Sequence, residues 1–221
     1  MKLYLVRHPR PRIPPGICYG RLDAPLAEPA SAAARRVRAR LPAEFETWPL
    51  WTSPSRRCLE LAAALHHAPR VDARLQEMDF GDWENHDWNS IDRAALDAWA
   101  ARPLDFAPPG GECARAALAR ALAFVLELEQ NRVHNAVCVT HAGIMRLLCA
   151  ARQDMPQGWS TRAFPYETVL RWPEARVADE CRKEENAPPP HAVQSGDGSS
   201  RNGLQTPSGR ERTQHPLRAK Q

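Results

Sequence analysis

A cation and an imidazole, Arg7 and His8, stand where the first apolar run of the chain ends. Residues 3–6 (Leu-Tyr-Leu-Val) are typical of a strand buried on both faces, and Pro9 prevents this strand from continuing. In open α/β sheets ligands bind outside the carboxyl ends of the strands, so the pair stands where a site would lie. Taken alone, it could equally be a capping arginine beside an ordinary loop histidine.

Two further predicted strands end in a similar way. Residues 48–52 are short and apolar, and residues 53–57 (Ser-Pro-Ser-Arg-Arg) follow them at the start of a predicted helix. Residues 136–140 form an apolar run that ends at His141, where another helix begins. Arginine in the first turn of a helix favours phosphate or carboxylate binding, because backbone N–H and guanidinium groups then donate together. With helical crossovers the three strand ends lie on one edge of the sheet, which predicts a single site.

Residues 75–84 (Leu-Gln-Glu-Met-Asp-Phe-Gly-Asp-Trp-Glu) place carboxylates among Leu, Phe and Trp. A carboxyl group beside apolar side chains is suited to act as a general acid. The alternative is a surface loop that its aromatic side chains anchor. Two imidazoles and two arginines would make a strongly positive pocket, so we expect a compact dianion such as phosphate as its ligand.

The elements that would position these residues alternate between strands and helices, which predicts an α/β fold. Apolar spacing predicts helices over residues 30–41, over 55–65, from Trp88 to before Pro103, and over 113–130. Residues 168–172 can supply one more strand. The tryptophans at 88 and 99 are expected in the core.

The amino-acid composition favours some classes of protein over others. The chain has 221 residues, 43% hydrophobic and 25% charged, with a net charge of +4, which indicates a globular domain and does not favour nucleic acid as a partner. Its six cysteines include no Cys-x-x-Cys pair and are expected to be buried thiols of a reducing compartment. We expect no signal peptide, no membrane span and a cytoplasmic location.

The last part of the chain differs from the rest. From residue 174 onward there is no Phe, Tyr, Trp, Ile or Met, and Pro, Ser, Gly and charged residues dominate. Such a segment buries too little apolar area to offset an ordering entropy of roughly 1–2 kcal/mol per residue. We therefore expect one domain over residues 1–173 and a disordered low-complexity tail over residues 174–221.

Four motifs, in the same order, make the chain resemble the histidine phosphatase (phosphoglycerate mutase-like) superfamily. These are Arg7-His8, the Ser-Pro-x-x-Arg motif at residues 53–57, Leu-x-Glu-x-x-Phe-Gly-x-Trp-Glu at 75–84 and Thr-His-Ala-Gly at 140–143. The resemblance runs from residue 2 to about 172. It implies a three-layer α/β/α sandwich with a mostly parallel central sheet, and an enzyme that needs neither metal nor cofactor.

The resemblance also implies roles for individual residues. His8 would attack phosphorus and form a phosphohistidine, while Arg7, Arg57 and His141 would hold the phosphate oxygens. Glu77 would protonate the leaving alcohol and then activate water. The register of the second motif selects Arg57 and not Arg56.

Within the superfamily the chain is most similar to alpha-ribazole phosphatases, through Arg-His-Pro, residues 16–23 and residues 108–112. Tyr19 and Gly20 would then contact the substrate, a small phosphomonoester whose best candidate is alpha-ribazole 5'-phosphate of cobalamin biosynthesis. Pro9 replaces a commoner glycine, and its carbonyl can still orient the ring of His8. The alternatives are a phosphoglycerate mutase, a phosphoprotein phosphatase and a non-catalytic phospho-ligand binding module. The oligomeric state is not predicted.

Overall fold

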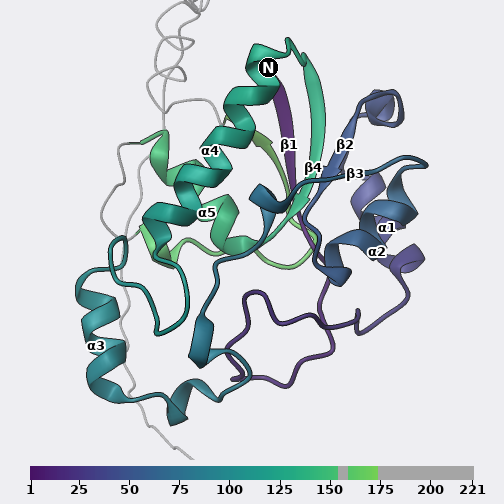
Figure 1. The fold of residues 1–221 in the computed structure, drawn as a ribbon. Coiled ribbons are helices and arrows are strands. Elements are labelled where there is room, and N and C mark those ends of the chain that lie inside the picture. The colour runs from purple at the N-terminus through teal and green to yellow at the C-terminus, as the bar shows by residue number, and fades with distance from the viewer. Residues whose placement is uncertain (154–158, 174–221) are drawn as a thin grey trace, which may run out of the picture. The chain divides into compact units, whose positions relative to one another are not determined.

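The structure, a computed structural model, describes residues 1–153 and 159–173. A five-stranded sheet in the order β3-β2-β4-β1-β5 forms its centre (Figure 1). The four parallel strands are β1 (Lys2–Arg7), β2 (Leu50–Thr52), β3 (Arg70–Val71) and β4 (Asn135–Thr140), and β5 (Val169–Trp172) pairs antiparallel with β1. The prediction of a mostly parallel sheet is confirmed.

The register of the parallel strands brings their carboxyl ends to one edge. Arg7, the last residue of β1, pairs with Thr140, the last residue of β4, and Thr52 of β2 pairs with Val139. The backbone N–H of His8 donates to Thr140 O at 3.0 Å, one residue beyond the strand. The chain segments that follow all three strands therefore start side by side, as the sequence predicts.

Side chains alternate between the two faces of the sheet, and helices cover both faces. Leu3, Leu5 and Cys138 belong to a core with α4 (Ala114–Gln130) and α5 (Ala142–Ala151). Val6 and Val139 belong to a second core with α1 (Ala30–Arg38) and α2 (Arg56–Leu65). Figure 1 shows the two pairs of helices on opposite sides of the strands. The three-layer α/β/α sandwich is confirmed.

Some element boundaries differ from those predicted. The helix predicted from Trp88 to Pro103 is two elements, the 3₁₀ helix η4 (Trp88–Ser90) and α3 (Arg93–Ala101). The break occurs because Asp92 caps α3, its Oδ2 accepting from Ala95 N at 3.0 Å. The remaining 3₁₀ helices are η1 (Ala43–Thr47), η2 (Ala73–Leu75), η3 (Gly81–Trp83) and η5 (Trp159–Thr161).

The predicted tail, residues 174–221, lies outside the described residues. Of the cysteines, Cys18, Cys58, Cys138 and Cys149 are buried as predicted, Cys113 is half-buried and Cys181 also lies outside the described residues. Among the residues that the structure describes, no helix has the length and apolar character needed to cross a membrane.

Candidate active site

The ring of His8 is held in one tautomer directly after β1. His8 is 2% exposed, and its Nδ1 lies 2.6 Å from Pro9 O. Because a carbonyl oxygen only accepts, Nδ1 carries the proton and Nε2 keeps its lone pair. Arg57 Nε donates to this Nε2 at 3.3 Å, which agrees with that tautomer. The expected role of the Pro9 carbonyl in orienting the ring is confirmed.

Arg57 is fully buried in the first turn of α2. Its Nη2 donates to Gly20 O at 2.5 Å and its Nη1 to Leu22 O at 2.8 Å. The neighbouring Arg56 is exposed and pairs with Glu60 one helical turn away at 2.5 Å. The structure thus places Arg57, and not Arg56, beside the histidines, as the motif register predicts.

His141 caps the start of α5, and its ring centroid lies 5.0 Å from that of His8. Arg57 Nη2 donates to His141 Nδ1 at 3.2 Å. The proton of His141 is therefore on Nε2, which donates to Ser53 Oγ at 2.8 Å. Ser53, the first residue of the second motif, consequently fixes His141.

Both imidazoles are neutral. Burial, followed by the charge of Arg57, holds the pKa of His8 well below 6.5. The pKa of His141 is also well below 6.5, for the same two reasons in the same order. At neutral pH His8 Nε2 therefore keeps its lone pair, which accepts from Arg57 Nε until an electrophile takes the place of that donor.

Arg7 is the second arginine close to His8. Its guanidinium group covers the ring of Tyr166 at 4.0 Å and donates through Nη1 to the carbonyl of Phe164. Arg7 Nε is buried and has no hydrogen-bond partner within residues 1–153 and 159–173. The hydroxyl of Tyr19 lies 2.8 Å from that of Tyr166. A buried cationic donor without an acceptor suits an oxyanion.

The carboxylate of Glu77 lies at the N-terminus of α5. Gly143 N donates to Glu77 Oε2 at 3.0 Å, and Met78 N donates to Oε1 at 3.2 Å. A Cβ atom on Gly143 would lie 2.3 Å from Glu77 Oε1, so the close approach requires glycine. The helix terminus therefore fixes the carboxylate through a backbone donor.

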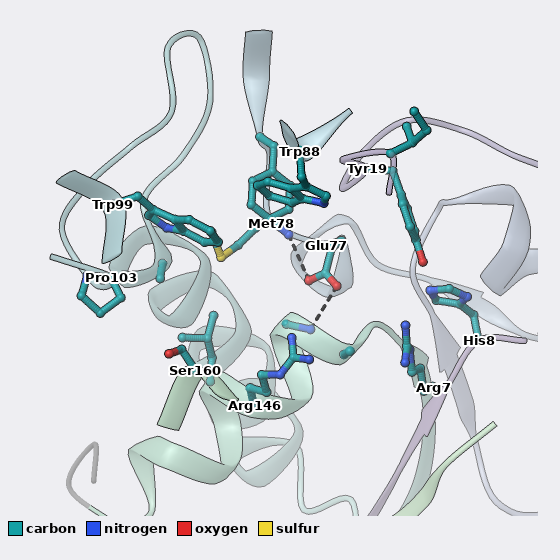
Figure 2. A pocket seen from close by; sticks show the side chains of 16 residues that line it. Arg7, His8, Tyr19, Glu77, Met78, Trp88, Trp99, Pro103, Arg146 and Ser160 are labelled. Atoms are coloured by element: carbon teal, nitrogen blue, oxygen red, sulfur yellow. Dashed lines mark hydrogen bonds between the residues drawn. The ribbon is translucent and has the colours of Figure 1, made fainter. Parts of the chain in front are cut away.

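These groups face a cavity of about 360 Å³ that has two chemically different ends (Figure 2). Arg7, His8 and Tyr19 form the polar end, while Trp99 and Pro103 lie at the opposite end. Glu77 and Arg146 lie between the two ends, on opposite sides of the space. The volume is in the range of sites for small molecules.

Most of the predicted site residues meet here, but not all in the predicted way. Arg57 and His141 are absent from the described residues that line the cavity; both are fully buried beside His8. Gly20 is also not part of the lining; its carbonyl binds Arg57, and a Cβ there would lie 1.9 Å from Met78 O. Tyr19 lines the cavity as expected.

The cavity wall includes residues that the sequence did not identify as part of a site, among them one cation and two tryptophans. Arg146 is the one charged residue of α5, and that isolation in an apolar helix is the signal that could have identified it. Trp88 and Trp99 were expected in the core; instead they stack on each other with an interplanar angle of 8° and line the cavity. Their spacing in the sequence fits a position in the core and a position in the cavity wall equally well, so periodicity could not distinguish these two positions.

A neutral, oriented imidazole with two arginines close to it, at the carboxyl edge of the parallel strands, defines an enzyme site for a phosphoryl group. The family model of the histidine phosphatase superfamily (branch 1) matches residues 3–169, and the chain belongs to this superfamily. It is a phosphatase that acts on small phosphorylated substrates.

Individual relatives differ in the activities that their names state. The chain is 28% identical to a putative phosphoserine phosphatase 2 of Hydrogenobacter thermophilus, over 66% of this chain and 76% of the relative. It is also 28% identical to an adenosylcobalamin/alpha-ribazole phosphatase of Salmonella typhimurium, over 71% and 81%.

Solved structures show the same diversity. A mycobacterial glucosyl-3-phosphoglycerate phosphatase has a TM-score of 0.65 and 28% identity, covering 77% of this chain and 88% of that one. A phosphoglycerate mutase from Thermus thermophilus has a TM-score of 0.63 and 30% identity, covering 78% and 94%.

Proposed function

We propose that the protein hydrolyses a phosphomonoester through a phosphohistidine on His8. Nε2 of His8 attacks phosphorus while the ester oxygen leaves in line on the opposite side. Arg7, whose side chain lines the cavity beside His8, donates to one phosphate oxygen. Arg57 Nε, now 3.3 Å from His8 Nε2, donates to another, since an oxygen of the attacked group must come close to it.

His141 belongs to the same cluster, and its contacts support two roles in sequence. Its Nδ1 accepts from Arg57, so it orients that guanidinium group before substrate binds. To donate to the phosphate as well, its Nε2–H would have to exchange Ser53 Oγ for a phosphate oxygen. Phosphoryl transfer depends mainly on positioning and charge neutralisation, which this arrangement supplies.

Glu77 is the proposed general acid. Its carboxyl group shares the cavity with His8, and Gly143 N holds one of its oxygens at 3.0 Å. It protonates the leaving alcohol, and as a carboxylate it then takes a proton from the water that hydrolyses the phosphohistidine. The single observation that carries the whole proposal is the fixed tautomer of His8, with Nε2 unprotonated and in contact with Arg57.

Glu77→Gln tests the acid directly. We expect a loss of about 10²–10⁴ in kcat on an alkyl phosphate, the usual contribution of a general acid. The loss on p-nitrophenyl phosphate should be much smaller, because its leaving group needs no proton. Equal losses on both substrates would reject Glu77 as the acid, and full activity of His8→Ala would reject the nucleophile.

The apolar end of the cavity supports a leaving alcohol that carries an aromatic ring. Trp88 and Trp99 form a stacked pair, and Ile17, Met78 and Phe80 also contribute to the lining. A flat heterocyclic base on the alcohol would pack there while its phosphate reaches His8. We therefore propose alpha-ribazole 5'-phosphate as the physiological substrate, which agrees with the name of the Salmonella relative.

A second candidate is a phosphorylated hydroxy acid, because Arg146 offers a cation between the two ends of the cavity. Its Nε donates to Arg162 O at 2.6 Å, and its guanidinium group faces the space beneath Glu77. A carboxylate of phosphoserine or a phosphoglycerate would pair with it. The relatives named for such substrates are consistent with this alternative.

Two variants separate the candidates. Trp99→Leu should raise KM for alpha-ribazole 5'-phosphate roughly fivefold to hundredfold, since stacking on a base contributes about 1–3 kcal/mol. It should leave phosphoserine turnover nearly unchanged. If instead phosphoserine is the better substrate and Arg146→Gln raises only its KM, the hydroxy acid is correct and the cobalamin assignment is wrong.

A further inference from the structure

The proposed acid lies in a segment that has no regular secondary structure of its own. Residues 76–80 connect η2 to η3 without a helix or strand, and Glu77 is the second of them. A catalytic group needs to be held within about 0.5 Å of its productive position. The donors at Gly143 and Met78 fix the carboxylate but not the backbone that carries it.

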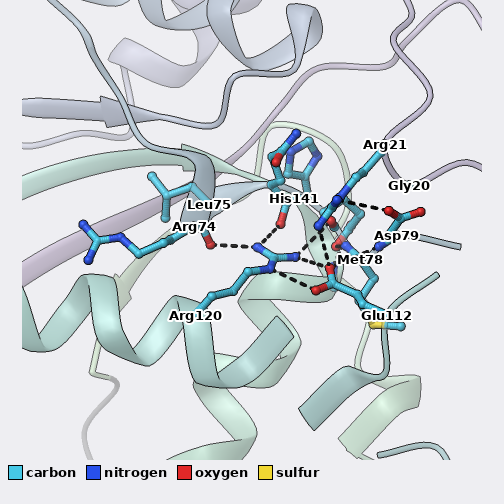
Figure 3. Close-up of polar contacts among 12 residues, drawn as sticks. Gly20, Arg21, Arg74, Leu75, Met78, Asp79, Glu112, Arg120 and His141 are labelled. Atoms are coloured by element: carbon cyan, nitrogen blue, oxygen red, sulfur yellow. Dashed lines mark hydrogen bonds and ion pairs between the residues drawn. The ribbon is translucent and has the colours of Figure 1, made fainter. Parts of the chain in front are cut away.

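One side chain of α4 binds this backbone. Arg120 Nη1 donates to Arg74 O at 2.8 Å and to Gln76 O at 2.6 Å, and Nη2 donates to Glu77 O at 3.0 Å. Three carbonyls within four residues thus converge on one guanidinium group (Figure 3). The geometry is specific to arginine, because an ammonium group is compact and cannot reach all three.

Glu112 holds the same guanidinium group from the other side. Its Oε1 accepts from Arg120 Nη2 at 2.5 Å and its Oε2 from Arg120 Nε at 3.2 Å. Glu112 Oε1 also accepts from Asp79 N at 3.2 Å, and Glu112 N donates to Asp79 O at 2.9 Å. The pair therefore binds the segment on both sides of Glu77, at residues 74–77 and at Asp79.

The Arg120–Glu112 pair is shielded, with side chains 17% and 16% exposed, so solvent weakens it less than an exposed ion pair. Arg120 is not among the described residues that line the cavity. It therefore does not touch a ligand there; its hydrogen bonds act on the segment that carries Glu77, and besides burial its charge contributes to the lowered pKa of His141. From these contacts we infer that the Arg120–Glu112 pair positions Glu77 for proton transfer to the leaving group. This inference rests on the assignment of Glu77 as the general acid.

Loss of a residue that only stabilises the fold would lower kcat on both substrates alike. Loss of a residue that positions the acid would lower kcat only on the substrate whose leaving group needs a proton. Arg120→Gln should lower kcat on an alkyl phosphate by about tenfold to hundredfold, since a displacement of about 1 Å costs up to that much. The loss on p-nitrophenyl phosphate should stay below about threefold, with KM for both substrates nearly unchanged. Arg120→Lys should fall between Arg120→Gln and the parent protein.

Two further variants make this test independent of folding defects. Glu112→Gln keeps an acceptor for Arg120 but removes the charge, so it should show a smaller loss with the same selectivity. Arg115→Gln is the matched control, because Arg115 is an exposed arginine of the same helix and pairs only at the surface with Asp105 at 2.7 Å. Arg115→Gln should leave kcat unchanged on both substrates.

The double variant Glu77→Gln/Arg120→Gln decides the route of action. If Arg120 acts through Glu77, the double variant is no slower on the alkyl phosphate than Glu77→Gln alone. Additive losses, or equal losses of Arg120→Gln on both substrates, would overturn the inference and leave the proposed function intact. If Glu77→Gln lowered activity equally on both substrates, the assignment of Glu77 as the acid would be overturned, and this inference with it.

Discussion

The chemistry of the site depends on individual side chains whose hydrogen-bond partners permit one protonation pattern. Pro9 O requires the proton of His8 on Nδ1, and Arg57 requires the proton of His141 on Nε2. Arg57 lies at the centre, since it contacts both imidazoles and two loop carbonyls. The motif around residues 53–57 was therefore sufficient to identify the residue that organises the site.

Replacing Arg57 should damage both activity and stability. Arg57→Met removes a charge-assisted contact to phosphate worth about 1.5–3 kcal/mol, so activity should fall at least tenfold to a few hundredfold. It also leaves the buried carbonyl of Gly20 without its donor, at a cost of about 1–3 kcal/mol, and the half-buried carbonyl of Leu22 without its donor, at a smaller cost. Steady-state kinetics and urea denaturation measure the two effects.

The adjacent arginine provides the control for that experiment. Arg56 is exposed, and its pair with Glu60 across one helical turn contributes only about 0.3–0.5 kcal/mol. Arg56→Met should therefore leave kcat/KM and the free energy of unfolding nearly unchanged. If Arg56→Met is the more damaging of the two, the assignment of Arg57 is wrong.

Sequence motifs identified the site residues at the strand ends. They did not identify the residues that only tertiary packing brings to the site. Arg7, His8 and Glu77 follow from the sequence because each has a fixed position relative to a strand or loop motif. Tyr166 reaches Arg7, and Trp99 reaches the cavity beside Trp88, only through the packing of distant segments. No local pattern carries that information.

At the scale of elements, the N-terminus of α5 positions Glu77, and the end of β1 positions His8. The fold class could be predicted because alternating apolar strands and amphipathic helices permit few arrangements. Boundaries were less accurate: α1 ends at Arg38 rather than at residue 41, and β2 begins at Leu50 rather than at residue 48. β3 was missed because its two residues, Arg70 and Val71, are both exposed and leave no apolar pattern.

The N-terminus of α5 gives an element-scale prediction. In Gly143→Ala the new Cβ would lie 2.3 Å from Glu77 Oε1, so the carboxylate must move away. Alanine is the better helix former by up to about 1 kcal/mol, so stability should not fall much. We expect kcat on an alkyl phosphate to drop about tenfold or more, and p-nitrophenyl phosphate to be affected far less.

Thermal denaturation distinguishes this effect from a folding defect. A melting temperature close to that of the parent protein, together with selective loss on the alkyl phosphate, supports displacement of Glu77. Unchanged activity on both substrates would show that the contact between α5 and Glu77 is not needed for catalysis.

At the scale of the whole molecule, two neutral histidines in the interior link stability to pH. Burial and the charge of Arg57 hold the pKa of His8 and of His141 well below 6.5. Between those folded-state values and 6.5 the unfolded chain binds more protons. The free energy of unfolding should therefore fall as the pH decreases from 6.5, by up to about 1.4 kcal/mol per pH unit for each imidazole.

Urea denaturation between about pH 7.5 and pH 5.5 measures this slope. Two carboxylates with lowered pKa, Asp72 and Glu167, titrate below their usual values of 3.8 and 4.5 and so contribute little in that window. His8→Asn should show a shallower slope than the parent protein. Stability that rises as the pH falls from 6.5 would contradict the neutral burial of these rings.

The central claim is that His8 carries the phosphoryl group between the two half-reactions, and the most direct measurement is to trap it. Rapid quenching in alkaline detergent during turnover of a radiolabelled phosphomonoester, followed by peptide mapping, locates the label. The account predicts a phosphoramidate on His8, stable to base and labile to acid, and no label in His8→Ala. Label on any other residue, or turnover in His8→Ala at the parent rate, would contradict it.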